Sequence, residues 1–352
     1  MSAARWCVAA PSRRAVSLGK QLCRSLVVSC ARPSVTSAAS ASMYVAEDRG
    51  SPYSPDYRVY FKDASGPISP LHDIPLWADR AARLAHMVVE VPRWSNAKME
   101  LSLAEPLNPI RQDVKSGALR YVANVFPHHG YIWNYGALPQ TWEDPRHVDA
   151  ATRARGDNDP VDVIEIGARV AARGDVLRVK LLGVLALIDE GETDWKLLAI
   201  DARDPAAAAL HGPADVEARF PGLLRATVEW FRLYKVPDGK PPNAFAFDAE
   251  VKDAAFAHRV VDEVHEFWRG LVSGEADAGD INNESWAGAL RAPRRGRGAR
   301  VLARPGERGG RRRRHQQVSH GPVLFAHRVV DEVHEFWRGL VSGEADAGDI
   351  NK

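Results

Sequence analysis

Cysteine is scarce in this sequence: Cys7, Cys23 and Cys30 all lie within the first 30 of its 352 residues. The rest of the chain can form neither a disulfide nor a thiolate metal site, which excludes a disulfide-stabilised scaffold and fits a reducing compartment. No apolar run approaches the ~20 residues of a membrane-spanning helix, so no membrane partner is expected. The chain also lacks the G-x-G-x-x-G, G-x-x-x-x-G-K-[ST] and G-x-S-x-G motifs, which argues against a P-loop protein and a serine hydrolase.

Acidic residues are missing from residues 1–46, which carry six basic side chains and a charge of +6. Residues 283–324 contain eleven arginines and two glutamates, a charge of +9, although the whole chain has a net charge of only +2. The remaining residues therefore carry −13, and an acidic body is not expected to bind nucleic acid. To bind an anion, such a body needs metal ions or well-placed lysines and arginines.

The uneven composition divides the chain into parts. Residues 1–43 are rich in Arg, Ser and Ala and contain no acid, which is the pattern of a mitochondrial transit peptide. Their apolar run Leu26–Val28 is too short for a secretory signal. Residues 44–282 are expected to form the globular domain. Residues 283–324, rich in Arg, Gly and Pro without a periodic apolar pattern, are expected to be a disordered spacer.

One segment of the chain occurs twice without a single change. Residues 256–282 recur as residues 325–351, so residues 325–352 are interpreted as a duplicate of a helical segment. Structural repeats normally diverge and stack in larger numbers. One hypothesis is an aberrant transcript or gene model that contains one exon twice, with the spacer read from the intron between the copies. In the alternative interpretation the arginine-rich spacer is an arm that binds RNA or acidic lipid.

Short strands dominate the expected secondary structure of residues 55–250. Alternating or β-branched apolar residues predict strands at 87–91, 97–103, 119–125, 161–167, 176–188 and, after a tight turn at 190–193, at 195–200. Proline at a first-turn position and helical apolar spacing predict helices at 213–220, 221–233 and 249–271. Antiparallel strands joined by short turns indicate a closed β-barrel, and hence a mainly β fold with flanking helices, of the α+β class.

Three carboxylates stand within six residues in Asp157-Asn-Asp159-Pro-Val-Asp162, where Pro160 stiffens the turn. Carboxylates this close repel each other and stay ionised only if cations lie between them. Hard oxygen ligands at this spacing suit Mg²⁺, or Mn²⁺ as a substitute, shared with a phosphate substrate. Taken alone, the motif is equally well interpreted as a solvated acidic loop.

Charged residues also occur two apart, a spacing that puts both side chains on one face of a strand. Such pairs are Lys98 with Glu100, Asp157 with Asp159, and Asp194 with Lys196. With Asp162 and Asp189 they would line a barrel mouth with acids and a few lysines, which binds several divalent cations together with a polyanion. Additional long side chains that can donate hydrogen bonds are Arg120, Lys235, Tyr131, Tyr135 and Tyr234. Taken singly, each of them is more often an ordinary surface or core residue.

Five motifs in sequence order resemble the soluble family I inorganic pyrophosphatases of the eukaryotic branch and, with the N-terminal segment, its mitochondrial members. These motifs are Glu90–Glu100, Phe126–Tyr135, Asp157–Val163, Asp189–Lys196 and Phe231–Lys240. The resemblance extends from about Tyr53 to Asn282. It implies a small closed OB-like β-barrel flanked by helices, and an inorganic diphosphatase that splits pyrophosphate into two phosphates with Mg²⁺ and a metal-bridged hydroxide. It further implies a homodimer in the mitochondrial matrix.

The resemblance also implies roles for individual residues. Asp157, Asp162 and Asp194 would hold the tightest metals, while Asp189 and Glu100 would hold those that arrive with substrate. Asp159, which is counted among the metal ligands as well, would orient and deprotonate the bridging water. The phosphates would be clamped by Lys98, Arg120, Tyr135, Lys196, Tyr234 and Lys235, of which the first three are counted with Asp159 as catalytic. Glu90 and Tyr131 would complete the site.

The C-terminal part departs from the resemblance. Family members continue past the position of Asn282 with an extension, which is replaced here by the spacer and the duplicate segment. The expected alternative to an active enzyme is therefore a catalytically impaired, pyrophosphatase-like binding protein. Two identical helical segments could also compete for one groove, which would leave the apolar face of the displaced copy exposed.

Overall fold

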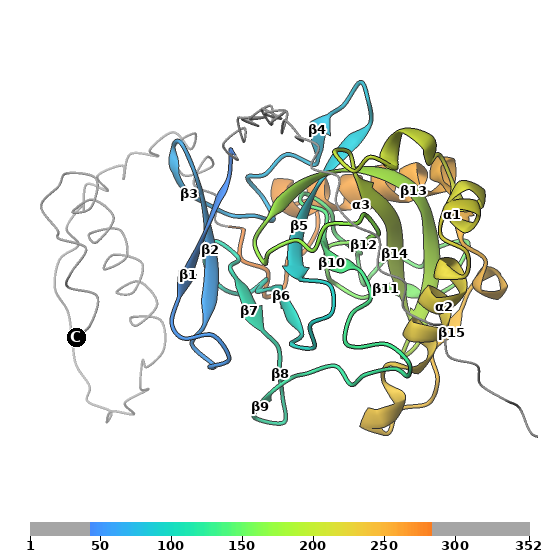
Figure 1. Cartoon of the computed structure of the whole chain (residues 1–352). Coiled ribbons are helices and arrows are strands. Elements are labelled where there is room, and N and C mark those ends of the chain that lie inside the picture. Colours follow the sequence, from blue (N-terminus) through green and yellow to red (C-terminus); the bar gives the residue numbers. More distant parts are fainter. Residues whose placement is uncertain (1–42, 284–352) are drawn as a thin grey trace, which may run out of the picture. The chain divides into compact units, whose positions relative to one another are not determined.

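The computed structural model describes residues 43–283 (Figure 1). Apart from Met43 and Asn283, the predicted transit peptide at 1–43, the spacer at 283–324 and the duplicate at 325–352 lie outside the described residues. Among the residues that are described, no helix is long and apolar enough to cross a membrane. The described part is mostly β-structure with a few helices, which confirms the predicted fold class.

Five strands of the larger sheet form a closed ring. They are β5 (Leu84–Val91), β10 (Asn134–Ala137), β12 (Asp162–Glu165), β13 (Val176–Asp189) and β14 (Glu192–Asp201). The order β14-β12-β10-β5-β13 is closed because β13 pairs again with β14, its hairpin partner. Neighbours in the ring are antiparallel except β12 and β14, which run parallel and place Asp162 opposite Lys196. This parallel pair is a departure from the all-antiparallel pattern that the short turns predict.

Shorter strands extend the ring and form a second sheet. The ring is extended by β4 (Trp77–Asp79), β11 (Arg155–Gly156), β15 (Ala244–Phe245) and β16 (Lys252–Asp253). The second sheet contains β1 (Val45–Arg49), β2 (Arg58–Asp63), β3 (Gly66–Ile68), β6 (Met99–Leu101) and β7 (Ile110–Gln112). A small hairpin consists of β8 (Val114–Lys115) and β9 (Ala118–Leu119).

Three α-helices follow the long hairpin of β13 and β14 (Figure 1): α1 (Pro213–Arg219), α2 (Leu223–Leu233) and α3 (Ala254–Ser273). α3 packs on β13 of the ring. Its start is fixed by Asp253, whose carboxylate accepts a hydrogen bond from the Phe256 N–H at 2.8 Å, a typical N-cap. The predicted helix at 249–271 begins later than expected because Lys252 and Asp253 pair with β13 as β16.

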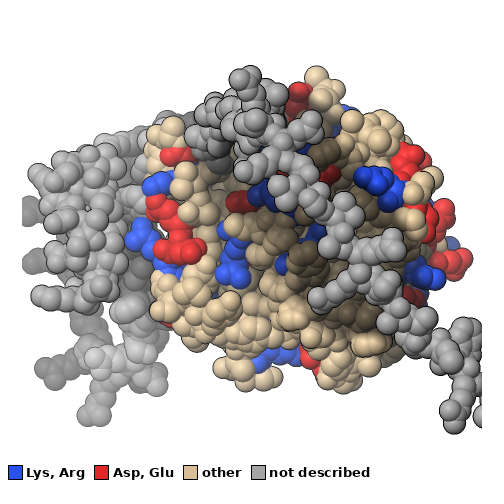
Figure 2. All heavy atoms as spheres, in the orientation of Figure 1, with Lys and Arg blue, Asp and Glu red and all other residues tan. Residues whose placement is uncertain are grey.

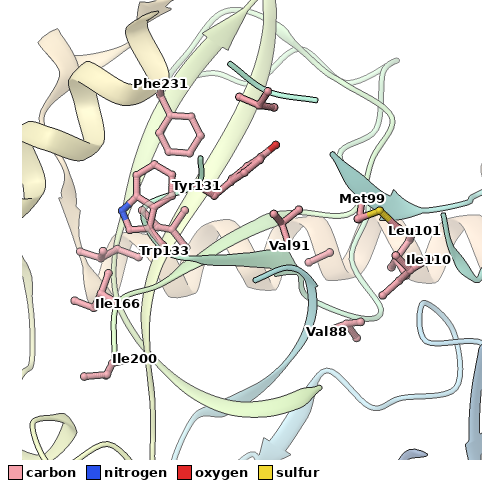
Figure 3. Close-up of a cluster of buried hydrophobic side chains, with 14 of the residues drawn as sticks. Val88, Val91, Met99, Leu101, Ile110, Tyr131, Trp133, Ile166, Ile200 and Phe231 are labelled. Atoms are coloured by element: carbon pink, nitrogen blue, oxygen red, sulfur yellow. The ribbon is translucent and has the colours of Figure 1, made fainter. Parts of the chain in front are cut away.

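Both faces of the ring are buried, which explains the long apolar runs in its strands. In β5, Val88 belongs to one hydrophobic cluster, whereas Val89 belongs to a second cluster that includes the buried face of α3. In the first cluster, the rings of Trp133 and Phe231 stack at 4.9 Å and lie near Tyr131 (Figure 3). This aromatic group anchors α2 and the strand β10 that follows Trp133, and both elements carry predicted site residues.

The predicted strand at 119–125 is largely wrong. Only Leu119 belongs to a strand, β9, and Tyr121 forms an isolated bridge with Ala97. The Arg120 N–H donates to the Asp113 carbonyl at 2.8 Å, and the Arg120 carbonyl accepts from the Lys98 N–H at 3.1 Å. The backbone here is bonded to separate segments rather than to one ladder, a long-range arrangement that local apolar alternation does not reveal.

Candidate active site

The acidic residues of the Asp157 motif lie where β11 leads into β12. Asp157 and Asp159 are in the connecting loop, and the Asp159 N–H donates to Asp157 Oδ1 at 3.0 Å. Asp162 is the first residue of β12 and Asp194 lies in the adjacent strand β14. The loop is pinned from the other side, because Glu143 N–H donates to the Asp159 carbonyl at 2.9 Å. The tight motif and the hairpin strand thus bring their carboxylates to one place.

Lys196 is the central cation of this group. Its ammonium donates to the carboxylates of Asp162 and Asp194, and lies 3.2 Å from the Tyr135 hydroxyl. The Lys196 side chain is only 3% exposed. Burial alone would lower the pKa of Lys196, but Asp162 and Asp194 outweigh that effect and raise the pKa well above its usual value. Lys196 therefore remains charged and holds the two carboxylates together.

The carboxylates around Lys196 are too crowded for a single ammonium to neutralise. Burial raises the pKa of Asp194 to about 7, even though Lys196 opposes the shift. Burial also raises the pKa of Asp157 well above its usual range, with Asp194 and Asp159 adding to the effect. Asp159 has a solvent-exposed side, yet reduced hydration and the nearby Glu100 raise its pKa to about 7. The group has an excess of negative charge that a divalent cation would relieve.

Glu143 belongs to this acidic group although the sequence analysis did not select it. One carboxylate oxygen of each of Glu143, Asp157 and Asp194 lies within 4.8 Å of the others. Glu143 Oε1 accepts from the Trp195 N–H at 3.1 Å, while its buried Oε2 has no hydrogen-bond partner. Glu143 stands outside all five motifs, and its position beside Asp157 results from long-range backbone pairing. No local sequence signal distinguishes it from other glutamates.

A second group joins Lys98 to two acids, one in β6 and one just after β7. Lys98 Nζ donates to Glu100 Oε2 at 2.5 Å, as the spacing of two residues predicts, and lies 3.6 Å from Asp113 Oδ2. Arg120 Nη1 donates to the same Asp113 oxygen at 3.0 Å. Asp113 was also missed by the sequence analysis, because it is a lone acid next to β7 with no motif around it. It holds both predicted phosphate-binding cations in one position.

A third group forms around Asp189 at the end of β13. Lys235 Nζ donates to both Asp189 oxygens at 2.5 Å, and the Tyr234 hydroxyl donates to Oδ2 at 3.2 Å. The Tyr234 ring stacks on Trp230 of α2 at 5.0 Å. Lys235 also lies 3.4 Å from Glu190, which is exposed. The C-terminal end of α2 thus delivers two predicted phosphate ligands to a predicted metal ligand.

Glu90 and Tyr131 lie between these groups. Glu90 of β5 is buried, and its Oε1 accepts from the Leu101 N–H at 2.7 Å. Burial raises the pKa of Glu90 well above its usual range, and Asp162 adds to the shift. The buried Tyr131 ring lies 5.1 Å from the Tyr135 ring. Burial also raises the pKa of Tyr131, against the opposing charges of Lys98 and Arg120.

The predicted site residues therefore assemble into neighbouring groups of opposite charge. Figure 2 shows acidic and basic side chains next to one another on the face in view. In the described structure each lysine of the site is paired with a carboxylate: Lys98 with Glu100, Lys196 with Asp162 and Asp194, and Lys235 with Asp189. The possible metal ligands Glu143, Asp157 and Asp194 are all carboxylates, and one oxygen of Glu143 is buried without a hydrogen-bond partner. Such an all-oxygen set of ligands fits Mg²⁺ or Mn²⁺.

Comparison with known proteins decides the family. The profile of the family described as "Inorganic pyrophosphatase" matches residues 87–269, which is more than half of the chain. This chain belongs to the inorganic pyrophosphatase family. The family resemblance inferred from the five motifs is thereby confirmed, and every predicted site residue falls within the matched range.

Individual relatives agree with this assignment. The chain is 60% identical over 242 residues to the inorganic pyrophosphatase of Drosophila melanogaster, covering 68% of this chain and 72% of the relative. It is 56% identical over 257 residues to inorganic pyrophosphatase 2, mitochondrial, of Mus musculus, covering 68% and 78%. The solved inorganic pyrophosphatase from Schistosoma japonicum is 50% identical with a TM-score of 0.67, covering 68% of this chain and 86% of that one.

Proposed function

We propose that this chain hydrolyses inorganic pyrophosphate to two phosphates with Mg²⁺ as cofactor. The observation that carries the proposal is the contact of Lys196 with Asp162 and Asp194 inside a larger excess of carboxylates. Such a site has ligands for cations and, next to them, cations for a polyanion. Membership of the pyrophosphatase family names the substrate that combines both needs.

The carboxylates would hold the metal ions. Asp157, Asp162 and Asp194 would bind the tightest ions, and Asp189 and Glu100 those that enter with the substrate. Bound Mg²⁺ would acidify water and neutralise phosphate charge. With these carboxylates engaged by Mg²⁺, their partners Lys196, Lys235 and Lys98 would be available to phosphate oxygens.

Asp159 would act as the general base. It has no lysine partner among the described residues, unlike the acids that pair with Lys98, Lys196 and Lys235. A pKa of about 7 lies near the operating pH, where a base is most effective. Asp159 would accept a proton from the attacking water while the new bond to phosphorus forms. The bond from that phosphorus to the bridging oxygen would then break, and the second phosphate would leave.

The basic and hydroxyl side chains would hold the charge of both phosphates. Arg120 offers a planar guanidinium, which suits bidentate contact with phosphate oxygens, and Asp113 fixes its direction. Lys98, Lys196 and Lys235 would act as point charges around the leaving phosphate, and Tyr135 and Tyr234 as neutral donors. Glu90 and Tyr131, which are both buried, would support the cluster.

Location and assembly are part of the proposal. The acid-free composition of residues 1–43 and the mitochondrial name of the mouse relative support the mitochondrial matrix. A reporter fused to these residues should be imported by isolated mitochondria. A homodimer is supported by the exposed rings of Trp94 (57%) and Phe126 (95%), whose loops are joined by a hydrogen bond from Asn96 to Asn124. Light scattering should give twice the chain mass, and replacing both rings by serine should give the monomer.

The test of the proposed activity is phosphate release from pyrophosphate. The purified chain is expected to release two phosphates per pyrophosphate with Mg²⁺ and none in excess EDTA. A parallel assay of residues 44–282 separates the body from the C-terminal part. Activity in both forms supports tolerance of residues 283–352, and activity in the short form alone would restore the impaired-protein alternative for the full chain. A folded but inactive body would contradict the proposal.

A further inference from the structure

Glu143 combines three features that a purely structural glutamate does not need. Its side chain is buried, with 2% of the residue exposed. Its Oε1 is fixed by the Trp195 N–H at 3.1 Å, which orients the carboxylate. Its Oε2 is buried without a hydrogen-bond partner and belongs to a cluster in which oxygens of Glu143, Asp157 and Asp194 lie within 4.8 Å of one another. A buried carboxylate oxygen without a donor is costly, and here two like charges stand beside it.

The surroundings offer Glu143 no direct basic partner. The ammonium of Lys196 donates to Asp194, Asp162 and Tyr135. No ion pair is formed by Glu143 within the described residues. Burial, with Asp157 and Asp194 adding to the effect, raises the pKa of Glu143 well above its usual range, so its carboxylate is costly to ionise here without a cation. A divalent ion would satisfy the unpartnered oxygen and the excess charge together.

We propose that Glu143 is a further acidic member of the cation site, and that it binds a divalent metal ion together with Asp157 and Asp194. This inference rests on the proposed function, because it assumes that the site holds metal ions. Glu143 then links the metal to the fold. Its carboxylate accepts a hydrogen bond from the Trp195 N–H of β14. Its backbone N–H donates to the carbonyl of Asp159 in the loop.

The competing interpretation is that Glu143 only anchors the Trp195 N–H. Glu143→Gln distinguishes this anchoring role from metal binding, because the glutamine carbonyl can accept the same hydrogen bond but has no charge. If Glu143 is a metal ligand, glutamine removes the carboxylate that would bind the ion and so weakens metal binding. It should not destabilise the metal-free protein, because burial and the neighbouring Asp157 and Asp194 already disfavour the charged form of Glu143 there. Affinity for metal should therefore fall, while stability without metal should not.

Glu165→Gln is the matched control. Glu165 is also a buried glutamate of the ring, but its oxygens accept from Asn134 Nδ2 at 2.7 Å and from the N–H groups of Gly167 at 2.7 Å and Asp201 at 2.8 Å. An amide in its place turns an NH₂ group toward these donors and loses hydrogen bonds. This variant should be less stable than wild type but should bind metal with the affinity of wild type.

The experiment uses the purified full chain, stripped with a chelator, and measures Mn²⁺ binding by calorimetry and urea unfolding in EDTA. Glu143→Gln should weaken the tightest Mn²⁺ site by about tenfold or more. Its urea midpoint in EDTA should equal or exceed that of wild type. Unchanged Mn²⁺ affinity, or a lower urea midpoint in EDTA, would overturn the inference. If wild type itself bound no Mn²⁺, the metal site of the proposed function would fail instead.

Discussion

Lys196 of β14 stands directly opposite Asp162 of β12, and its buried ammonium donates to that carboxylate. This pair depends on the one parallel contact in the ring, because β12 and β14 are brought together without a short turn between them. Asp194, two residues before Lys196, shares the same ammonium. The pairing thus couples the closure of the sheet to the charge balance of the site.

Lys196→Met should unfold more easily when metal is absent. It leaves Asp162 and Asp194 without their counter-charge, and removing one partner of a buried ion pair costs about 3–5 kcal/mol. Mg²⁺ should recover a large part of this loss, because it replaces the missing positive charge. Urea unfolding at pH 8 in EDTA and in Mg²⁺ measures both effects.

The control for this prediction is Lys115→Met. Lys115 pairs with Asp238 at 3.0 Å on the surface, where both side chains are well exposed, so its loss should change the unfolding free energy by less than about 1 kcal/mol. An equal, Mg²⁺-independent loss in Lys196→Met and Lys115→Met would show that Lys196 has no special role in neutralising the site.

Gly136 lies where β10 pairs antiparallel with β5, at a shift in the register of the two strands. A Cβ atom at this position would stand 1.9 Å from the Val88 carbonyl oxygen, so Gly136→Ala must displace the backbone. We expect a loss of at least about 2 kcal/mol in unfolding free energy and reduced phosphate release, because Tyr135 is the adjacent residue. Thermal unfolding and the activity assay measure the two effects.

Gly270→Ala in α3 provides the comparison. Its added Cβ would make an ordinary contact, 3.8 Å from the Ala276 Cβ, and alanine favours a helix by about 1 kcal/mol over glycine. This variant should match or exceed wild type in stability. If both alanine variants behaved alike, the close approach of β10 and β5 would not be a constraint on the fold.

His72 should make the fold less stable in mild acid. Its Nδ1 accepts from Trp268 Nε1 at 3.0 Å and its Nε2 lies 3.1 Å from the Asn282 carbonyl, so the buried ring is suited to the neutral form. Burial lowers the pKa of His72 in the folded state below its unfolded value of about 6.5. Its contribution is therefore complete above that pH, and is lost as the pH falls from there toward the folded-state pKa.

The loss should appear as the difference between wild type and His72→Gln in urea unfolding from pH 7.5 to 5. The difference in unfolding free energy should shrink on acidification, by at most about 1.4 kcal/mol per pH unit for one proton. His129 lies at an exposed position, so the unfolding free energy of His129→Gln should differ from that of wild type by a constant amount over this pH range. Parallel curves for His72→Gln as well would exclude this histidine as a source of acid sensitivity.

Local sequence patterns were sufficient for the parts of the site that lie close together in the chain. The Asp157 motif, the pair of Lys98 and Glu100 and the hairpin carrying Asp194 depend on turns and on the two-residue period of strands. These contacts could be predicted because they join residues that are only a few positions apart in the sequence. The apolar runs of β13 and β14 likewise predict buried strands, since both faces of the ring are covered.

The residues that were missed depend on pairing between distant segments. Glu143 reaches Asp157 through hydrogen bonds between their loops, and Asp113 reaches Lys98 and Arg120 because three separate segments meet. Local periodicity contains no information about such encounters, which also explains the wrong strand at 119–125. The roles assigned to the site residues, the transit peptide and the C-terminal parts remain predictions.

The most direct test of the central claim is the turnover of Asp159→Asn beside wild type in saturating Mg²⁺ and pyrophosphate. Asparagine keeps the size of the side chain but cannot accept the proton of the attacking water, so turnover should fall at least about 100-fold. Circular dichroism and the urea midpoint should show a folded protein. Wild-type turnover in a folded Asp159→Asn variant would contradict the account of this carboxylate as the base for pyrophosphate hydrolysis.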